Sequence, residues 1–328
     1  MTNKRINIGV LGCASIAQRS MIPAILALNT HFNLIGIASR DPERAKCVAS
    51  KFNIEAYDGY EALLDHPRLD AVYVPLPNAL HAKWIERSLK KDLHVLAEKS
   101  LACNLKDVVH LNQLARDRNL VLLESFQFRF HRQMDFIRQL IKKGTIGELR
   151  SLRSSFGFPP FADKTNIRYD KRLGGGALLD AGAYPLKAAQ IFLGEDLKVK
   201  AASLCYDARK GVDIWGGAYL HHNKSNVFAQ VAFGFDHYYQ CNLELWGSKG
   251  KITTGRIFTA PAGHRAVIEV ETPSGKKIIK VPCDNAFNKI LKYFVELVIH
   301  KKGMEDEYRQ NINQARLIAE VRTKADEK

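Results

Sequence analysis

Lysine and tyrosine side chains occur in this sequence at positions from which they could pass a proton to a carbonyl oxygen. Lys99 ends an apolar run that begins at His94, and open α/β sheets bind their ligands at the carboxyl ends of such strands. Asp180 and Tyr184 are four residues apart in one predicted helix, so they project from the same face. A tyrosine hydroxyl near a lysine ammonium has a lowered pKa, which suits Tyr184 as the acid in ketone reduction or the base in alcohol oxidation.

Each of these residues also has a purely structural explanation. Lys99 would then be one of many surface lysines, and Asp180 would cap or pair within its own helix. Tyr184 would be an aromatic residue at the edge of the core, with its hydroxyl bonded to the backbone. We expect Lys99 and Tyr184 to be catalytic, and Asp180 to orient the substrate or the catalytic group.

Histidine and cysteine residues indicate neither a metal site nor a disulfide framework. His131, His221 and His222 are expected to be structural or exposed, because no third ligand at metal spacing accompanies them. The six cysteines lie tens of residues apart without a C-x-x-C pair, which is typical of reduced thiols in a cytoplasmic protein. No export signal and no run of ~20 apolar residues occurs, so we expect a soluble, cytoplasmic protein without membrane partners.

Strands and helices must position these groups, and they alternate through residues 1–125. Apolar runs without polar alternation are typical of strands buried on both faces, and the helix-periodic segments between them indicate a parallel, doubly wound sheet. The predicted strands are Ile6–Leu11, Asn33–Ala38, Ala71–Val74, His94–Ala97 and Leu120–Glu124, and the predicted helices are Ile16–Leu28, Pro42–Lys51, Tyr60–Leu64, Ala82–Leu89 and Leu105–Asp117.

A different pattern begins after residue 125 and predicts a second domain at residues 126–328. Consecutive strands with hairpin-length gaps favour a largely antiparallel sheet. Its predicted strands are Glu148–Phe156, Val199–Tyr206, Ile214–Leu220, Val227–Phe235, Tyr239–Trp246, Lys251–Thr254, Ala266–Glu271 and Lys277–Val281, and the predicted helices are Gln133–Lys142, Ala177–Leu193, Ala286–His300 and Asn311–Lys324.

The first predicted strand runs into a small-residue turn that fits a dinucleotide-binding motif. Gly12, Ala14 and Ala17 match G-x-G-x-x-G with alanine at its second and third positions. Gly12 would make the tight turn, Ala14 would admit the pyrophosphate, and Ala17 would allow close packing of helix on strand. The pyrophosphate would lie on the amino end of the following helix. We therefore expect the cofactor loop to comprise Gly12, Cys13, Ala14, Ser15, Ile16 and Ala17.

The end of the second strand favours NADP over NAD. An NAD site places a carboxylate here to bind the ribose 2′-hydroxyl, whereas this strand ends in Ser39 and Arg40. A hydroxyl followed by a guanidinium suits a 2′-phosphate, which arginine can bind through two hydrogen bonds. Asp41 is an alternative NAD carboxylate, but Asp41-Pro42 is also typical of a helix start.

The chain at this point resembles the Gfo/Idh/MocA oxidoreductase family, which includes glucose-fructose oxidoreductase and inositol dehydrogenase. The resemblance covers nearly the whole chain and depends on ordered motifs. These are GVLGCASIA at the start, Pro75-Leu-Pro-Asn78-Ala-Leu-His81, Glu98-Lys99, Arg129-Phe-His131, Ile146-Gly-Glu148 and Gly174-Gly-Gly-Ala-Leu-Leu-Asp180-Ala-Gly-Ala-Tyr184-Pro. It implies a Rossmann domain at 1–125, a substrate-binding and oligomerisation domain with a mixed, largely antiparallel sheet at 126–328, and a nicotinamide between them.

The resemblance also assigns roles to individual residues. Lys99 matches the family's active-site lysine, Tyr184 the position that is His or Tyr, and Asp180 the acidic residue one turn earlier. The exposed face of the second sheet commonly makes the subunit interface, which implies a homodimer or homotetramer. One departure is Ser100, because the family has a proline after the lysine, and serine lacks its fixed φ. The implied cofactor-binding residues beyond the glycine loop are Ser39, Arg40, Leu76, Pro77, Asn78, His81, Glu98 and Lys99.

The formal net charge of +15 lies mainly in the second part of the chain. Residues 1–125 hold 16 basic and 13 acidic side chains, and residues 126–328 hold 33 and 21. Eleven basic and four acidic residues lie between Arg129 and Arg172. A positive field there would attract an anionic substrate such as a nucleotide diphosphate, and we expect Arg129, Arg168 and Tyr184 to bind it. The alternative is a basic surface that serves solubility.

Three functions remain compatible with these patterns. The first is NADP-dependent reduction of a keto group on a nucleotide-linked sugar, since the segment Asn166–Gly176 with Tyr184 resembles sugar C-3 ketoreductases. The second is oxidation of a free sugar or diol, because the same stretch resembles glucose-fructose oxidoreductase, xylose dehydrogenase and dihydrodiol dehydrogenase. The third is a non-catalytic NADP sensor, which has no need for Lys99 or Tyr184. Nucleic-acid binding is not expected, because no recognition motif accompanies the charge.

Overall fold

The computed structural model describes residues 5–163 and 165–327. The chain divides into two compact units, and each is described by itself. The first contains Met1–Ser125 and Phe287–Ile312, and the second contains Phe126–Ala286 and Asn313–Lys328. The first unit thus ends at Ser125 before the chain enters the second, and it also takes in the later segment Phe287–Ile312.

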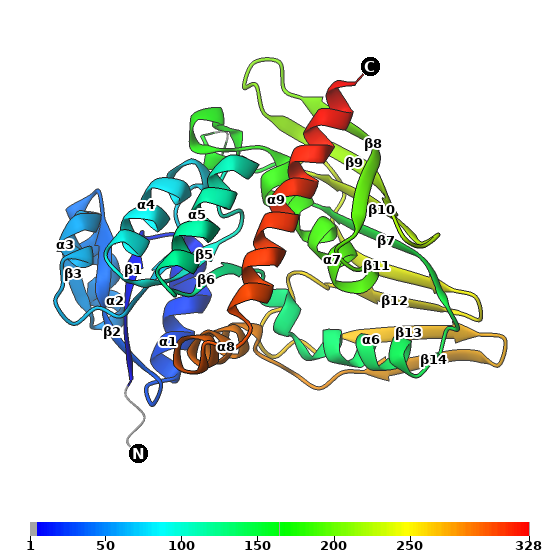
Figure 1. The fold of residues 1–328 in the computed structure, drawn as a ribbon, viewed down its shortest axis with the longest axis horizontal. Coiled ribbons are helices and arrows are strands. Elements are labelled where there is room, and N and C mark those ends of the chain that lie inside the picture. Colours follow the sequence, from blue (N-terminus) through cyan, green and yellow to red (C-terminus); the bar gives the residue numbers. More distant parts are fainter. Residues whose placement is uncertain (1–4, 164, 328) are drawn as a thin grey trace. The chain divides into compact units, whose positions relative to one another are not determined.

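Six parallel strands form the sheet of the first unit (Figure 1). Their order, β3-β2-β1-β4-β5-β6, is that of a Rossmann fold and confirms the predicted doubly wound sheet. The edge strand β3 was not predicted, because its sequence EAYD is largely exposed and lacks an apolar run. The strands are β1 (Ile6–Leu11), β2 (Phe32–Ser39), β3 (Glu55–Asp58), β4 (Ala71–Val74), β5 (His94–Glu98) and β6 (Leu122–Ser125).

Helices connect these strands, as parallel pairing requires. Helix α4 packs beside α5 (Figure 1). The first helix begins at Ser15 and contains a π-helical turn, Ala17–Met21, before α1 (Ile22–Ala27). The other helices between the strands are α2 (Pro42–Phe52), α3 (Tyr60–Leu64), α4 (Asn78–Lys90) and α5 (Leu105–Asp117).

Eight strands form the sheet of the second unit, in the order β14-β13-β12-β11-β7-β10-β9-β8. Every neighbouring pair is antiparallel except β7 and β10, so the sheet is mixed and largely antiparallel, as predicted. The strands are β7 (Leu149–Gly157), β8 (Leu197–Tyr206), β9 (Asp213–His222), β10 (Phe228–Gly234), β11 (Gln240–Gly247), β12 (Lys251–Gly255), β13 (Val267–Thr272) and β14 (Gly275–Lys280).

Alternation along these strands separates a buried face from an open one. Leu152 and Phe156 of β7 are buried, whereas Arg153 between them is exposed. Helix α7 (Ala183–Leu193) packs on β7 and β10, and its apolar residues are buried almost all round. The sheet therefore supports the helix that carries Tyr184.

Two helices end the chain, α8 (Ala286–His300) and α9 (Met304–Asp326). Helix α9 begins at Met304, earlier than the predicted Asn311. Its first turn, Glu305-Asp306-Glu307, is acidic, which stabilises a helix amino end but lacks apolar periodicity. In the described part of the chain, no helix is long and apolar enough to cross a membrane.

Candidate active site

The turn after β1 is shaped for a close approach of ligand to backbone. Gly12 has φ +119, and a Cβ there would lie 2.8 Å from a side-chain carbon of Leu76. Its N–H donates to Ala38 O at 2.8 Å, which ties the turn to β2. Ala17, at the third position of the motif, is fully buried. The structure thus favours glycine at position 12 and buries the residue at the third position of the motif.

The end of β2 presents a hydroxyl and an exposed guanidinium. The buried Ser39 Oγ accepts a hydrogen bond from Asp41 N–H at 3.2 Å. Asp41 caps α2, because its carboxylate accepts from Arg44 N–H at 3.2 Å, and Pro42 occupies the first helical position. This confirms that Asp41-Pro42 begins a helix. Arg40 is exposed, and its guanidinium has no ion-pair partner among residues 5–163 and 165–327.

Arg44 is a second cation at this edge that sequence reasoning missed. Its Nη2 donates to Cys13 O at 3.2 Å, so the guanidinium lies against the glycine loop. The Cys13 thiol is buried, and burial raises its pKa although Arg44 and Ser39 act to lower it. The signal in the sequence was its place in the first turn of α2, directly after the Asp41 cap.

The loop after β5 carries Lys99 and is held by polar contacts. Lys99 is 9% exposed and Ser100 3%, and the peptide bond between them is cis. Glu98 accepts from the Tyr73 hydroxyl at 2.8 Å, and burial raises the pKa of Glu98 despite Tyr73 and Lys99. Leu101 N–H donates to Glu124 at 3.1 Å. These contacts hold a loop that has serine where the family has proline.

His81 contacts the same loop from helix α4. Its Nδ1 lies 2.7 Å from Ser100 O and its Nε2 lies 2.7 Å from Leu76 O, and the side chain is fully buried. Burial lowers the pKa of His81 to about 4, with a smaller contribution from the Lys99 charge, although the two carbonyl oxygens favour the protonated ring. His81 thus fixes backbone in two loops of the first unit.

A buried carboxylate anchors the helix that bears Asp180 and Tyr184. Asp213, the first residue of β9, accepts from Leu178 N–H at 2.5 Å. Gly176 has φ +116, and a side chain there would collide with the Asp213 carboxylate. Burial raises the pKa of Asp213, although bonds from backbone N–H groups lower it. This role was missed, because the carboxylate comes from a distant strand.

Four phenylalanine rings surround Tyr184. Ring centroids of Phe126, Phe128, Phe156 and Phe258 lie 5.6, 5.9, 5.2 and 5.5 Å from that of Tyr184. Tyr184 is 9% exposed. The predicted alternative of a tyrosine at the edge of the core therefore describes the ring correctly, while the role of its hydroxyl stays a proposal. We call these four residues the aromatic cage.

Asp180 pairs with Arg168, outside its own helix. Arg168 Nε donates to Asp180 Oδ2 at 2.6 Å, and the guanidinium stacks over Phe161 at 4.9 Å. Burial lowers the pKa of Arg168, but Asp180 and then Tyr184 raise it, and the net change is upward. The structure thus brings three predicted site residues, Arg168, Asp180 and Tyr184, into one cluster. The predicted Arg129 lies in a short 3-10 helix (Gln127–Phe130) and stacks over Phe130 at 5.2 Å.

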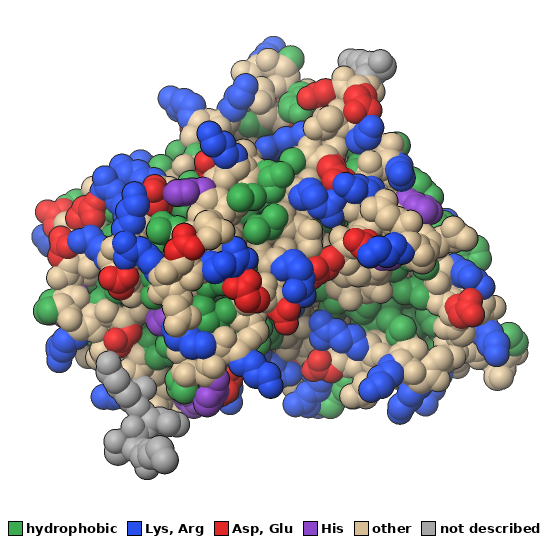
Figure 2. All heavy atoms as spheres, viewed as in Figure 1, with side chains coloured by type: hydrophobic (Ala, Val, Ile, Leu, Met, Phe, Trp, Pro, Cys, Tyr) green, Lys and Arg blue, Asp and Glu red, His purple; other side chains and the backbone are tan. Residues whose placement is uncertain are grey.

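Other basic residues of the segment 129–172 do not join this cluster. Arg150 pairs with Glu148 at 2.9 Å, and the exposed Arg172 pairs with Asp170 at 3.0 Å. Arg153 lies on the open face of the sheet, where it bonds Gln230. Lys164 lies outside the described residues. Figure 2 shows lysine and arginine side chains interspersed with acidic ones on the face drawn, so net charge alone does not locate a substrate site.

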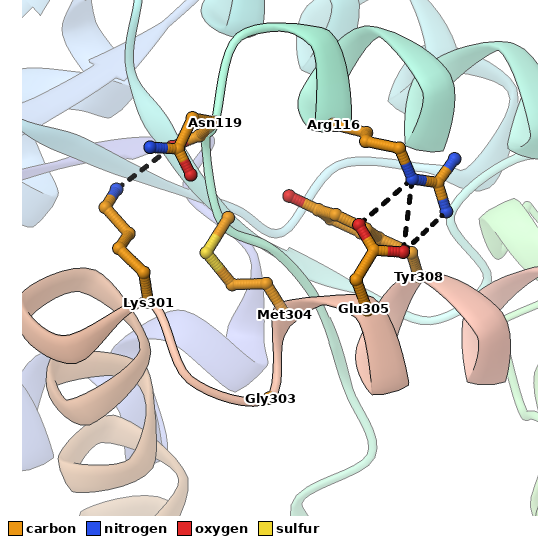
Figure 3. A pocket seen from close by; sticks show the side chains of 7 residues that line it. All are labelled: Arg116, Asn119, Lys301, Gly303, Met304, Glu305 and Tyr308. Carbon is orange, nitrogen blue, oxygen red and sulfur yellow. Dashed lines mark hydrogen bonds and ion pairs between the residues drawn. The ribbon is translucent and has the colours of Figure 1, made fainter.

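A separate pocket lies elsewhere in the first unit (Figure 3). Lys301 donates to Asn119 O at 3.0 Å, and Glu305 pairs with Arg116. Asn119 precedes β6, whereas Lys99 follows the neighbouring parallel strand β5, so the pocket lies at the amino ends of these strands and Lys99 at their carboxyl ends. The lining residues are Arg116, Asn119, Lys301, Gly303, Met304, Glu305 and Tyr308. Among the described residues, no group of three His, Cys, Asp or Glu could hold a metal ion.

Both parts of the chain match models of known protein families. Residues 6–126 match the family model for the oxidoreductase family with an NAD-binding Rossmann fold, and residues 134–253 match the Gfo/Idh/MocA C-terminal domain. A dTDP-3,4-didehydro-2,6-dideoxy-alpha-D-glucose 3-reductase from Saccharopolyspora spinosa is 43% identical over 92% of this chain and 90% of that protein. A D-xylose 1-dehydrogenase (NADP(+)) from Haloferax volcanii is 37% identical over 77% of this chain and 75% of that protein.

A solved structure gives the same result for the fold. The crystal structure of a 3-ketoreductase from Actinomadura kijaniata in complex with NADP and TDP-benzene superposes with a TM-score of 0.94 and 39% sequence identity, over 98% of both chains. The family models, the relatives and this structure agree on both parts of the molecule. The chain belongs to the Gfo/Idh/MocA family of oxidoreductases.

Proposed function

We propose that this chain is an NADP-dependent oxidoreductase that reduces the keto group of a nucleotide-linked deoxysugar. The observation that carries the proposal is similarity to four relatives named as dTDP-3,4-didehydro-2,6-dideoxy-alpha-D-glucose 3-reductases. They are 39–43% identical to this chain, over 90–98% of its length. The 3-ketoreductase from Actinomadura kijaniata was crystallised with both NADP and TDP-benzene. These two ligands represent the cofactor and the nucleotide part of the substrate that we propose here.

The residues at the ends of β1 and β2 fit NADP. The φ of +119 at Gly12 favours glycine at the turn, and the amino end of the following helix suits a pyrophosphate. Arg40 and Arg44 supply two cations beside Ser39, where an NAD site would need a carboxylate for the ribose. Asp41, the acidic residue that directly follows Arg40, is occupied as a helix cap. We assign Ser39, Arg40 and Arg44 to the 2′-phosphate.

The cofactor site is tested by an arginine substitution. Arg40→Ala should raise the Kd of NADPH by about 10- to 100-fold, because a charge-assisted hydrogen bond contributes about 1.5–3 kcal/mol. The Kd of NADH should stay within about 2-fold, since NADH has no 2′-phosphate. Arg118→Ala is the matched control, because Arg118 pairs with Asp92 away from the glycine loop. Equal losses for both cofactors, or tighter binding of NADH by the unaltered protein, would contradict the NADP assignment.

Lys99 and Tyr184 supply the acid–base chemistry in this proposal. When bound, the reduced nicotinamide supplies the hydride for ketone reduction. The reaction also needs a proton at the carbonyl oxygen, which the Tyr184 hydroxyl donates. The Lys99 ammonium stabilises the negative charge that develops on that oxygen. Asp180 pairs with Arg168 beside Tyr184 and balances the charge of the half-buried guanidinium. Arg168 can then contact a phosphate or sugar of the substrate.

A second candidate is oxidation of a free sugar or diol. The 37% identity to D-xylose 1-dehydrogenase (NADP(+)) favours it, although the match covers less of the chain. The decisive assay compares NADPH oxidation with a dTDP-linked 3-keto-deoxysugar and NADP⁺ reduction with D-xylose or a trans-dihydrodiol. The proposal predicts turnover of the nucleotide-linked ketone and competitive inhibition by thymidine diphosphate. Turnover of the free sugar without inhibition by the diphosphate would establish the alternative instead.

Self-association through the open face of the second sheet is a further part of the proposal. The strand registers place Trp215, Tyr219, Trp246 and Ile278 on one face, with exposed fractions of 36–56%. Large exposed apolar side chains on one surface mark interaction sites. We propose a homodimer or homotetramer through this face. Light scattering should show an oligomer that Trp246→Asp dissociates, and a monomeric unaltered protein would contradict it.

The compartment is proposed from the thiols. Cys47 and Cys283 are free thiols at the protein surface. Exposed free thiols persist in a reducing compartment. We propose a cytoplasmic location.

A further inference from the structure

We propose that His81 is a positioning residue that couples the loop carrying Lys99 to the loop that covers the glycine turn of the cofactor site. This inference rests on the proposed function, because Lys99 acts on substrate there. It goes beyond that function by giving a specific task to a histidine that touches neither the glycine loop nor the substrate in the proposal.

Contacts on one side of the imidazole reach the loop that carries Lys99. Nδ1 lies 2.7 Å from the carbonyl oxygen of Ser100, the residue that follows Lys99. Both Lys99 and Ser100 are nearly buried, so movement of this carbonyl changes the place from which the Lys99 side chain leaves the backbone. Tyr73 and Glu124 hold the flanking residues Glu98 and Leu101, respectively.

Contacts on the other side reach the loop after β4, which covers the glycine turn. Nε2 lies 2.7 Å from the carbonyl oxygen of Leu76. The Leu76 side chain lies over Gly12, within 2.8 Å of where a Cβ would be. A shift of the Leu76 backbone would therefore move the side chain that limits space at the glycine turn. His81 connects the turn after β1, the loop after β4 and the loop after β5.

Both partners of the His81 ring are carbonyl oxygens, which determines how the ring can bond them. Carbonyl oxygens only accept hydrogen bonds, so a ring nitrogen must carry hydrogen to bond either one. Helix α4 supplies a rigid base, since Trp84, Ile85 and Leu89 pack it onto the core. A neutral imidazole has one N–H, so it donates a hydrogen bond to only one of the two loops at a time. Both carbonyl oxygens nevertheless stay close to the buried His81 ring.

Two amide variants can separate the two contacts. In His81→Asn the amide nitrogen takes the place of Nδ1 and can donate to Ser100 O, whereas in His81→Gln it takes the place of Nε2 and can donate to Leu76 O. Because the neutral ring donates to one carbonyl oxygen at a time, each amide variant keeps one of the two alternative hydrogen bonds and removes the other, with an effect of up to roughly 10-fold. His81→Leu removes both. Ser88→Ala is the matched control, because Ser88 is equally buried on α4 but donates to Trp84 O within the helix.

The experiment measures the NADPH Kd by fluorescence and the hydride-transfer rate at saturating NADPH in single turnovers. We expect His81→Gln to keep the Kd within about 3-fold and to lower the transfer rate about 10-fold. His81→Asn should keep the rate and raise the Kd about 10-fold, and His81→Leu should show both losses. Ser88→Ala should lower thermal stability and leave both parameters unchanged. Equal losses in the Asn and Gln variants, in step with thermal stability, would overturn the proposal.

A measurement on the unaltered protein covers the case in which the variants fail to fold. Selective ¹⁵N labelling of histidine should show a ring N–H of His81 that exchanges slowly with water and is hydrogen-bonded, with or without NADPH. A rapidly exchanging ring would contradict the proposal. Neither this signal nor the NADPH Kd requires a sugar substrate, so failure of the proposed sugar reduction would be seen separately as an absence of turnover.

Discussion

Lys99 and Tyr184 lie in different units and are held in place by different physical means. Around Lys99 the backbone is hydrogen-bonded to buried side chains: His81 Nδ1 contacts Ser100 O, and Glu124 accepts from Leu101 N–H. Around Tyr184 the contacts are aromatic rings at 5.2–5.9 Å. The lysine follows a strand in a short loop, while the tyrosine lies near the start of a long buried helix.

This difference predicts different sensitivities to substitution. A hydrogen bond depends on one donor and one acceptor, and losing one partner in a buried place leaves the other unsatisfied. Ring packing is shared among several neighbours, so loss of one contact is partly compensated by the others. The loop of Lys99 should therefore respond sharply to single polar substitutions, and the aromatic cage should respond gradually.

The largest expected effect is that of Lys99→Ala. In the proposed mechanism Lys99 stabilises the negative charge that develops on the carbonyl oxygen, so the hydride-transfer rate should fall by about 10³- to 10⁴-fold without it. The NADPH Kd should change by less than about 3-fold, as titration of the cofactor can show. Lys106→Ala, an exposed lysine of α5, is the control. Full activity in Lys99→Ala would exclude the proposed role.

Tyr184→Phe should have a smaller effect, of about 10²-fold on the same rate. The phenylalanine ring keeps every contact with the aromatic cage, so thermal stability should be unchanged within the error of a melting curve. Stability and catalysis are thereby separated at one position. A variant with wild-type turnover would show that another group donates the proton.

Phe156→Leu tests the gradual response of the aromatic cage. Phe156 is buried and contacts Tyr184, Phe158 and Phe258. The smaller side chain should cost about 1–2 kcal/mol of unfolding free energy and slow hydride transfer only about 2- to 5-fold. Phe32→Leu, a buried phenylalanine of β2, should lose similar stability at unchanged rate. A loss of rate as large as that of Tyr184→Phe would contradict the idea of shared packing.

The smallest expected effect concerns pH and Asp213. The pKa of this carboxyl is raised in the folded state, so its contribution to stability is complete below its ordinary value and is lost as the pH rises through the raised pKa. Asp213→Asn cannot ionise. Urea unfolding should be measured at several pH values between about pH 4 and pH 7. As the pH rises, the free energy of unfolding of the variant should increase relative to that of the unaltered protein. A difference that is independent of pH would argue against the raised pKa.

Local sequence patterns predicted most of the elements. The bounds of β1, β4, α3, α5 and α8 agree with the predicted ones, because long apolar runs and clear periodicity determine strands and helices when burial is uniform. The failures occur where burial is low or the local pattern is polar. Strand β3 is an exposed edge, and the first turn of α9 is acidic.

The candidate site was predictable only in its local parts. The Gly12 turn and the Asp41 cap depend on neighbours in the sequence, so their patterns could be interpreted directly. The contacts of His81, Arg44 and Asp213 depend on chain segments that meet only after folding. The aromatic cage combines rings from three separate segments, and no spacing rule joins them in advance.

The most direct test of the account is a double-mutant cycle between Lys99 and Tyr184, measured on hydride transfer to the dTDP-linked ketone. If both residues act on the same carbonyl oxygen, the double variant Lys99→Ala with Tyr184→Phe should be no more than about 3-fold slower than Lys99→Ala alone. If the losses of the two single variants multiply in the double variant, the two residues act independently, and the central claim is contradicted.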